Sequence, residues 1–206
     1  VAAAANIVPF TAELGGKGAL VVFADSDLEA AARTASGQYD DSGQVCLAGT
    51  RLLVEESVAD EFLARFHDHV DTHVLGDSHD DVTTITPMIH PTHVARVEGF
   101  IDRARAAGDE LVRGGDRFVP DWWSGRPEHA LWVEPTLIAP ASNDSEIVQT
   151  EVFGPVLTFQ TFVGEDEAVV LANSTAYGLS ATLFTSSAQR AERVGSALRA
   201  GTTWVN

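Results

Sequence analysis

The chain has 206 residues, which is enough for one large domain with its own core and somewhat short for two. Its 30 acidic and 13 basic residues give a formal net charge of −17, and a surface of that sign repels nucleic acid and anionic lipid. No apolar run approaches the length of a membrane span, and the N-terminal alanine run has neither the basic nor the long apolar region of a signal peptide, so we expect no membrane segment and no export signal.

Apolar runs alternate with amphipathic helical stretches, which is typical of an α/β domain with a mainly parallel sheet. The first expected strand is 19–23. A helix should follow it from Ser26, where Ser26 and Glu29 have the spacing of a capping box, and run towards Tyr39.

The next expected strand is 51–54, and a second helix follows Ser57 and Asp60. Apolar residues spaced four apart predict the buried face of this helix. They are Val58, Phe62, Phe66 and Val70.

A third helix should end at Gly108, because glycine favours the helix C-terminus. The polar stretch 116–129, with its Trp122-Trp123 pair, is interpreted as a surface excursion. The apolar face of the third helix is expected to contain Val94, Val97 and Ile101.

Three further strands, 156–162, 181–185 and 202–205, and a helix over 188–199 complete the expected sheet. That last helix should end at Gly201.

Cys46 is the only cysteine, and it lies in the segment 43–51, Gly-Gln-Val-Cys-Leu-Ala-Gly-Thr-Arg. A single cysteine cannot form an internal disulfide, and the reducing cytoplasm, which we expect as the location, keeps a thiol available for chemistry. Taken alone, it would more often be a small buried apolar residue.

Two further motifs set the context of this cysteine. Residues 13–17 read Glu-Leu-Gly-Gly-Lys, and residues 151–155 read Glu-Val-Phe-Gly-Pro. With the Cys46 segment between them, these motifs resemble the aldehyde dehydrogenase superfamily, in the same order along the chain.

The resemblance implies that residues 1–206 are a catalytic-domain segment, truncated at both ends, with an open, mainly parallel sheet and flanking helices. The nucleotide-binding domain would lie outside this chain. The full-length protein is expected to be a homo-oligomer, a dimer or a tetramer, that acts on a small-molecule aldehyde with NAD or NADP.

The chemistry expected of such a site needs a thiol and a separate carboxylate. Cys46 is the expected nucleophile, which adds to the aldehyde and later holds a thioester. Glu13 is the expected general base for hydrolysis of that thioester. Superfamily members that transfer the acyl group to coenzyme A generally lack this base, so Glu13 favours hydrolysis.

The resemblance also implies cofactor contacts. Glu151 would accept hydrogen bonds from the ribose hydroxyls, and Phe153 would pack near the nicotinamide ring. Leu14 would touch the nicotinamide through its main chain, and Gly15 would let the turn pass close to the cofactor. Lys17 belongs to the motif, but no chemical step requires its charge, so it is interpreted as structural.

Val45 and Leu47 flank the nucleophile, and they either line the aldehyde tunnel or belong to the core. The residues around Cys46 resemble those of semialdehyde dehydrogenases of aromatic-compound breakdown and of betaine aldehyde dehydrogenases. We therefore expect a substrate of one of these kinds.

Other interpretations of the sequence remain open. The spacing from Glu13 to Cys46 is one residue shorter than the commonest arrangement, and Asp40, Asp41 and Ser42 replace more usual aromatic and amide residues, so an inactive or truncated domain that acts only as a fold or assembly unit is the alternative. Esterase activity without a cofactor is a third possibility. Histidines near residues 67–73 are expected to face solvent, so no metal site is predicted.

Overall fold

The computed structural model describes residues 2–206. Within that part, seven strands form one sheet in the order β3-β6-β7-β2-β1-β8-β9, in which only β3 and β6 pair antiparallel. The strands are β1 Ala19–Val22, β2 Arg51–Glu55, β3 Glu110–Arg113, β6 Thr136–Ala139, β7 Val156–Phe162, β8 Ser180–Phe184 and β9 Thr202–Val205. The expected α/β class with a mainly parallel sheet is confirmed.

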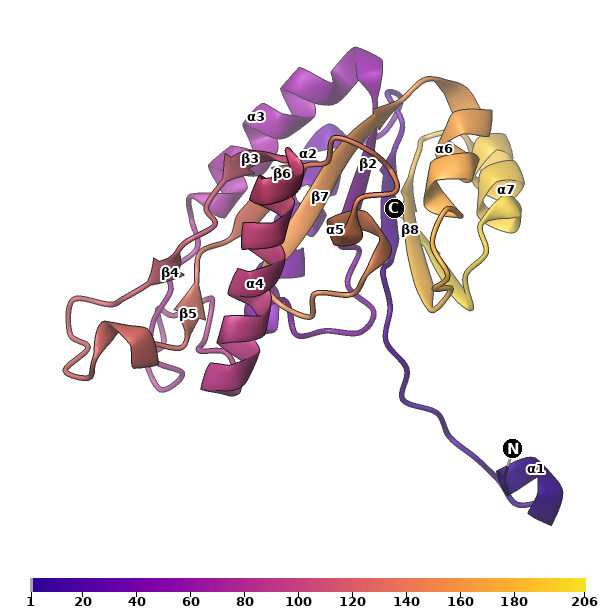
Figure 1. Cartoon of the computed structure of the whole chain (residues 1–206). Coiled ribbons are helices and arrows are strands. Elements are labelled where there is room, and N and C mark those ends of the chain that lie inside the picture. The colour runs from indigo at the N-terminus through magenta and orange to yellow at the C-terminus, as the bar shows by residue number, and fades with distance from the viewer. Residues whose placement is uncertain (1) are drawn as a thin grey trace.

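Helices cover both faces of the sheet (Figure 1). One face packs against α2 Leu28–Ser36 and α3 Ala59–Val70. The other packs against α6 Gly164–Ala172 and α7 Ala188–Ala197 beside β1 and β8, and against α4 Pro91–Ala107 and α5 Glu146–Gln149 beside β6 and β7. The short helix α1 Ala2–Asn6 lies away from the sheet at the end of an extended segment (Figure 1).

Burial on both faces explains the continuous apolar runs of the central strands. In β1, Leu20 and Val22 belong to the core under α2 and α3, whereas Ala19 and Val21 belong to the core under α6 and α7. All four side chains are at most 2% exposed. The central strands are therefore recognised in the sequence by continuous apolar runs, and not by the alternation of apolar and polar residues that a half-exposed strand shows.

The predicted capping box at Ser26 is wrong, whereas the second helix begins after Ser57, as predicted. The Asp27 carboxylate, not the Ser26 hydroxyl, accepts a hydrogen bond from the Ala30 amide, because Ser26 donates instead to the Phe23 carbonyl at 2.7 Å. Ser57 lies inside the 3-10 turn Glu56–Val58, which precedes α3 without a side-chain cap.

The first helix ends at Ser36, before the expected Tyr39, and a 3-10 segment, Gly37–Gly43, continues the chain towards Cys46. Tyr39 is fully buried there, and its hydroxyl donates to the Thr136 carbonyl at 2.9 Å. The end of α4 at Gly108, with φ +88°, is confirmed. α7 ends before the Gly201 that was expected to stop it, with Leu198 as its C-cap.

The excursion after α4 is more ordered than expected. Strands β4 Arg117–Phe118 and β5 Trp132–Val133 form a separate antiparallel pair, and a 3-10 turn covers Pro127–His129. Trp122 is 54% exposed and meets the buried Trp132 edge-on at 5.5 Å. The segment lies on the surface and is anchored by this aromatic contact.

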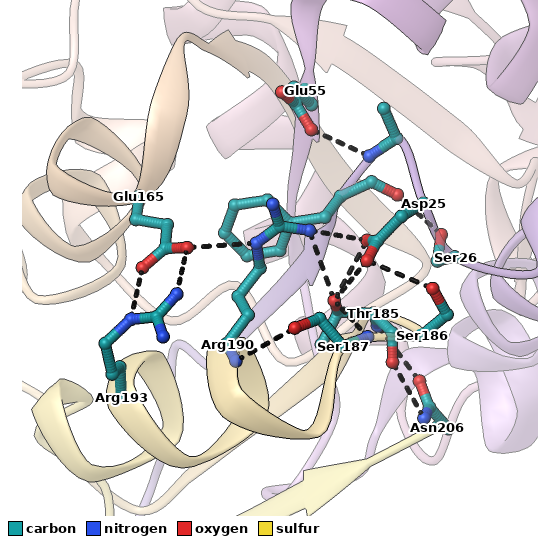
Figure 2. A network of polar contacts seen from close by, with 12 residues as sticks. Asp25, Ser26, Glu55, Glu165, Thr185, Ser186, Ser187, Arg190, Arg193 and Asn206 are labelled. Carbon is teal, nitrogen blue, oxygen red and sulfur yellow. Dashed lines mark hydrogen bonds and ion pairs between the residues drawn. The ribbon is translucent and has the colours of Figure 1, made fainter.

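A polar network closes the carboxyl ends of β1 and β8 (Figure 2). Asp25, just after β1, accepts hydrogen bonds from Thr185 and pairs with Arg190 at 2.7 Å. Arg190 also pairs with Glu165 at 3.1 Å. Asn206 exchanges two hydrogen bonds with the Thr185 main chain, each 3.0 Å. The candidate site lies at the opposite, amino-terminal edge.

Candidate active site

The three motifs lead into three neighbouring strands. Residues 13–17 precede β1, the Cys46 segment precedes β2, and residues 151–155 precede β7. Because β7, β2 and β1 are adjacent and parallel, their amino ends meet at one edge of the sheet. Segments that are distant in the sequence are brought together there by the topology.

An open pocket of about 530 Å³ lies at this edge. It brings together all but one of the predicted catalytic, cofactor and substrate residues. Its lining consists of Glu13, Leu14, Gly15, Gln44, Val45, Cys46, Glu151 and Phe153.

Leu47 is the predicted residue that does not line this pocket. It borders a neighbouring pocket of about 320 Å³ with Thr182 and Trp204, and Val45 borders both pockets. Val45 is 37% and Leu47 is 43% exposed, so neither belongs to the core of the described part of the chain.

The Cys46 segment is held by close backbone packing and side-chain hydrogen bonds. Gly43 has φ +65°, and a Cβ there would lie 2.2 Å from the Gly154 oxygen, so only glycine fits. The Gln44 side chain accepts a hydrogen bond from the Ile89 amide at 3.0 Å and donates to the Asp41 carbonyl at 2.9 Å. Cys46 itself is half-buried at the pocket, so its thiol is open to a small molecule.

The unusual residues before Cys46 form a left-handed stretch. Asp41 and Ser42 have φ of 52° and 55°, and the Ser42 hydroxyl donates to the Thr86 carbonyl. Asp41 is exposed, and within the described part of the chain no hydrogen bond or ion pair joins its carboxylate to Cys46. The segment that carries these substitutions is therefore held by its main chain and by Ser42.

Glu151 is held at three points. Its Oε1 accepts a hydrogen bond from the Gly16 amide at 2.9 Å, its amide donates to the Tyr177 hydroxyl at 3.2 Å, and its carbonyl accepts from Arg96 at 2.8 Å. In residues 2–206 no hydrogen bond reaches Oε2. One carboxylate oxygen is thus fixed, and the other is available to a ligand.

Phe153 has an uncommon backbone conformation for a bulky residue, with φ +59°. Its ring is 36% exposed and lines the pocket. The His93 ring donates through Nε2 to the Phe153 carbonyl and lies edge-on to the Phe153 ring at 6.0 Å. The sequence predicted neither His93 nor Arg96 as a residue that holds this segment. The spacing of three between His93 and Arg96 on a predicted helix was the only available signal.

Lys17, two residues after the pocket-lining Gly15, is fully buried. Burial, together with the nearby charge of Arg51, lowers its pKa to about 7, although the Glu151 carboxylate opposes this shift. Its Nζ has no hydrogen-bond partner among the described residues. Arg51 is also buried, but its guanidinium donates to the carbonyls of Lys17, Leu171 and Ala172.

The pocket has features that fit a nicotinamide nucleotide. Gly15 passes so close to Glu151 that a Cβ would lie 2.2 Å from Oε2, so a side chain there would cover the free oxygen. Leu14, 62% exposed, and Phe153 offer apolar surface beside that oxygen. A hydrogen-bond acceptor next to apolar walls suits a ribose joined to an aromatic ring.

Neither a metal site nor a membrane-spanning helix is found in residues 2–206. No group of three histidine, cysteine, aspartate or glutamate side chains could hold a metal ion. His69 instead pairs with Glu29 at 2.8 Å, and His73 bonds to Ser36 and Thr84. No described helix is long and apolar enough to cross a membrane.

Comparison with known sequences gives one consistent result. The model of the aldehyde dehydrogenase family matches residues 1–206. The betaine aldehyde dehydrogenases of Rhizobium johnstonii and of Bacillus subtilis are each 39% identical over 206 residues, which is all of this chain and 41% of theirs. The chain thus spans about two fifths of the length of these relatives.

Solved structures agree with the sequences. An NAD-dependent aldehyde dehydrogenase from Sinorhizobium meliloti matches 94% of this chain and 37% of its own, with a TM-score of 0.87 and 39% identity. Betaine aldehyde dehydrogenase from Staphylococcus aureus in complex with NAD+ matches 98% of this chain and 40% of its own, with a TM-score of 0.88 and 39% identity.

Proposed function

Because the chain belongs to the aldehyde dehydrogenase family, we propose that it is the catalytic-domain part of an enzyme that oxidises an aldehyde to a carboxylate with NAD or NADP. The observation that carries the proposal is the pocket in which a half-buried thiol, Cys46, meets two carboxylates, Glu13 and Glu151.

Cys46 begins the proposed reaction. Its thiolate forms a bond to the aldehyde carbon, and the carbonyl electron pair moves to oxygen, which the Cys46 amide can help to stabilise. A nicotinamide held beside Glu151 and Phe153 would supply the hydride acceptor for this carbon. The acyl group is then held on Cys46 as a thioester.

Glu13 completes the reaction by hydrolysis. It removes a proton from a water molecule as that water attacks the thioester carbon. The carbon–sulfur bond breaks, the thiolate of Cys46 is released, and the carboxylate product leaves. Glu13 and Cys46 lie on neighbouring strand entries, which supports the use of both groups on one acyl carbon.

Glu151 and Phe153 would hold the nicotinamide half of the cofactor, the carboxylate on the ribose and the ring beside the nicotinamide. Leu14 and Gly15 would border the same half. NAD is the first cofactor to test, since the similar structure from Staphylococcus aureus is a complex with NAD+. Adenosine contacts would come from outside this chain.

Betaine aldehyde is the first substrate to test, because the similar curated proteins named above are betaine aldehyde dehydrogenases. A semialdehyde of aromatic-compound breakdown is the second. Val45 borders the thiol and would contact the aldehyde chain, whereas Leu47 would act through the adjoining pocket.

The experiment uses the protein from the complete reading frame and follows reduced nicotinamide by absorbance across an aldehyde panel. Reduction that disappears in Cys46→Ala supports the proposal. In Glu13→Gln, a single turnover of reduced nicotinamide without steady-state turnover is expected, because the thioester would form and persist. A folded wild type that binds NAD but reduces none would refute the proposal and favour the inactive alternative.

A further inference from the structure

We propose that Arg96 and His93 of α4 are positioning residues that hold the main chain of the segment 151–153 and thereby aim the Glu151 carboxylate and the Phe153 ring. The inference rests on the proposed cofactor role of that segment. It assigns the two α4 side chains a role through the main chain and not through a contact with the cofactor.

The two side chains bind three successive carbonyl groups. Arg96 donates from one terminal nitrogen to the Glu151 carbonyl at 2.8 Å and from the other to the Val152 carbonyl. His93 Nε2 donates to the Phe153 carbonyl. Because a carbonyl only accepts, Nε2 must carry the proton. All three acceptors of the segment are therefore bound from one helix.

α4 is suited to this task because residues three apart share a helix face. The Arg96 guanidinium lies 4.7 Å from the centre of the Phe100 ring, a contact that limits the orientation of its plane. Val152 is buried in the same core cluster as Val94 and Val97. Helix α4 thus holds the segment 151–153 in two ways: it packs against the Val152 side chain, and it donates hydrogen bonds to the carbonyls of the segment.

The conformation of Phe153 explains why such support is needed. A left-handed conformation is unfavourable for a non-glycine residue. It persists only where the surroundings determine it. The φ of +59° at Phe153 coincides with the carbonyl that His93 binds, so this contact opposes relaxation of the turn.

Glu151 depends on the same support. Its Oε1 is fixed by the Gly16 amide and its own amide by the Tyr177 hydroxyl, so its main chain and side chain are both tied to neighbours. If the carbonyl were released from Arg96, the main chain could shift and the unpaired Oε2 would turn with it. Cofactor binding, and not the thiol, should then be the first property to change.

The experiment compares Arg96→Ala with Arg103→Ala in the complete protein. Arg103 is a matched control, since its guanidinium also lies 4.7 Å from the Phe100 ring but pairs with Glu146. Arg96→Ala should raise the NAD dissociation constant and KM by roughly tenfold or more, the effect of losing charged hydrogen bonds. Arg103→Ala should leave both near wild type.

Two further readouts separate positioning from general damage. Hydrogen exchange at residues 151–155 should accelerate in Arg96→Ala and not in Arg103→Ala, whereas the rate of Cys46 alkylation by iodoacetamide should stay unchanged. His93→Gln keeps an N–H donor and should bind NAD almost as wild type, whereas His93→Ala should bind it more weakly.

The outcomes are distinct. Unchanged exchange at 151–155 in Arg96→Ala overturns the proposal, and so does faster exchange with unchanged NAD affinity. A wild type that binds NAD but reduces none refutes the proposed function, while the exchange and affinity comparison still decides the role of Arg96. A wild type that binds neither NAD nor NADP overturns both.

Discussion

Replacing Lys17 by methionine should remove most of the pH dependence of stability between pH 7 and 9. Burial and the charge of Arg51 lower the Lys17 pKa from 10.5 to about 7, whereas the unfolded chain keeps the ordinary value. Between these values the unfolded state binds one more proton than the folded state, so the free energy of unfolding rises with pH. Methionine keeps an unbranched side chain without the charge.

The magnitude follows from the two pKa values. Each pH unit in that window adds up to ~1.4 kcal/mol, and the integrated gain from pH 7 to pH 9 is about 2 kcal/mol. Lys17 is the only lysine of these 206 residues, and groups elsewhere in the complete protein are shared by wild type and variant, so they cancel in the difference between the two slopes.

The assay is urea unfolding of the complete protein at pH 7, 8 and 9, followed by tryptophan fluorescence. Wild type should become more stable with pH, and Lys17→Met should stay nearly level. Arg33→Met removes a charge from an exposed position and should keep the wild-type slope. Equal slopes for wild type and Lys17→Met would show that the buried amine is not the group that titrates.

Three other substitutions probe the stability of the fold. Tyr39→Phe leaves a carbonyl without its buried partner and should lower the free energy of unfolding in urea by about 1–2 kcal/mol. Gly43→Ala should cost more than Gly108→Ala on thermal denaturation, by roughly 1 kcal/mol or more, because both glycines have positive φ but only Gly43 has backbone atoms where the Cβ would lie. Arg190→Leu should lower the melting temperature at neutral pH. The difference in melting temperature should shrink on acidification. Burial raises the pKa of Asp25, but hydrogen bonds from Thr185 and Ser186 and the Arg190 charge outweigh burial and lower that pKa. The stability contributed by the Asp25 carboxylate is therefore lost as the pH falls through the lowered pKa.

The central strands and the motifs could be read from the sequence, because both depend on local patterns. Val156–Phe162 and Thr202–Val205 have the predicted bounds, since their flanks are clear turn and loop signals. The capping box at Ser26 was wrong because the Ser26 hydroxyl donates to the Phe23 carbonyl, and the Asp27 carboxylate accepts from the Ala30 amide instead.

The strands β3 and β6 and the helix α6 were missed for a different reason. β3 has no fully buried residue, and β6 has only four residues, so neither has a strong periodic signal. α6 follows Val163, which provides no side-chain cap, and its first residue, Gly164, has φ +76°, so the usual sequence signals of a helix start are missing. Such elements are fixed by their neighbours in the fold and not by local propensity.

The site residues were predicted from sequence motifs, but the residues that hold them in place were not. Arg96 and His93 act on residues 55 to 60 positions further along the chain. Contacts at that separation depend on how α4 packs beside β6 and β7, which no local pattern specifies. The structure therefore adds the residues that hold the site to those that the sequence predicted.

The spacing of the strands also sets the separation of the three reactive and binding side chains. Neighbouring strands lie about 4.8 Å apart, so the entry to β2 places Cys46 one strand from Glu151 on one side and one strand from Glu13 on the other. Each group is attached to its own strand register. A residue gained or lost in one entry loop would re-aim one group and leave the other two in place, because each strand keeps its own pairing, such as that of Arg51 in β2 with Ala19 in β1.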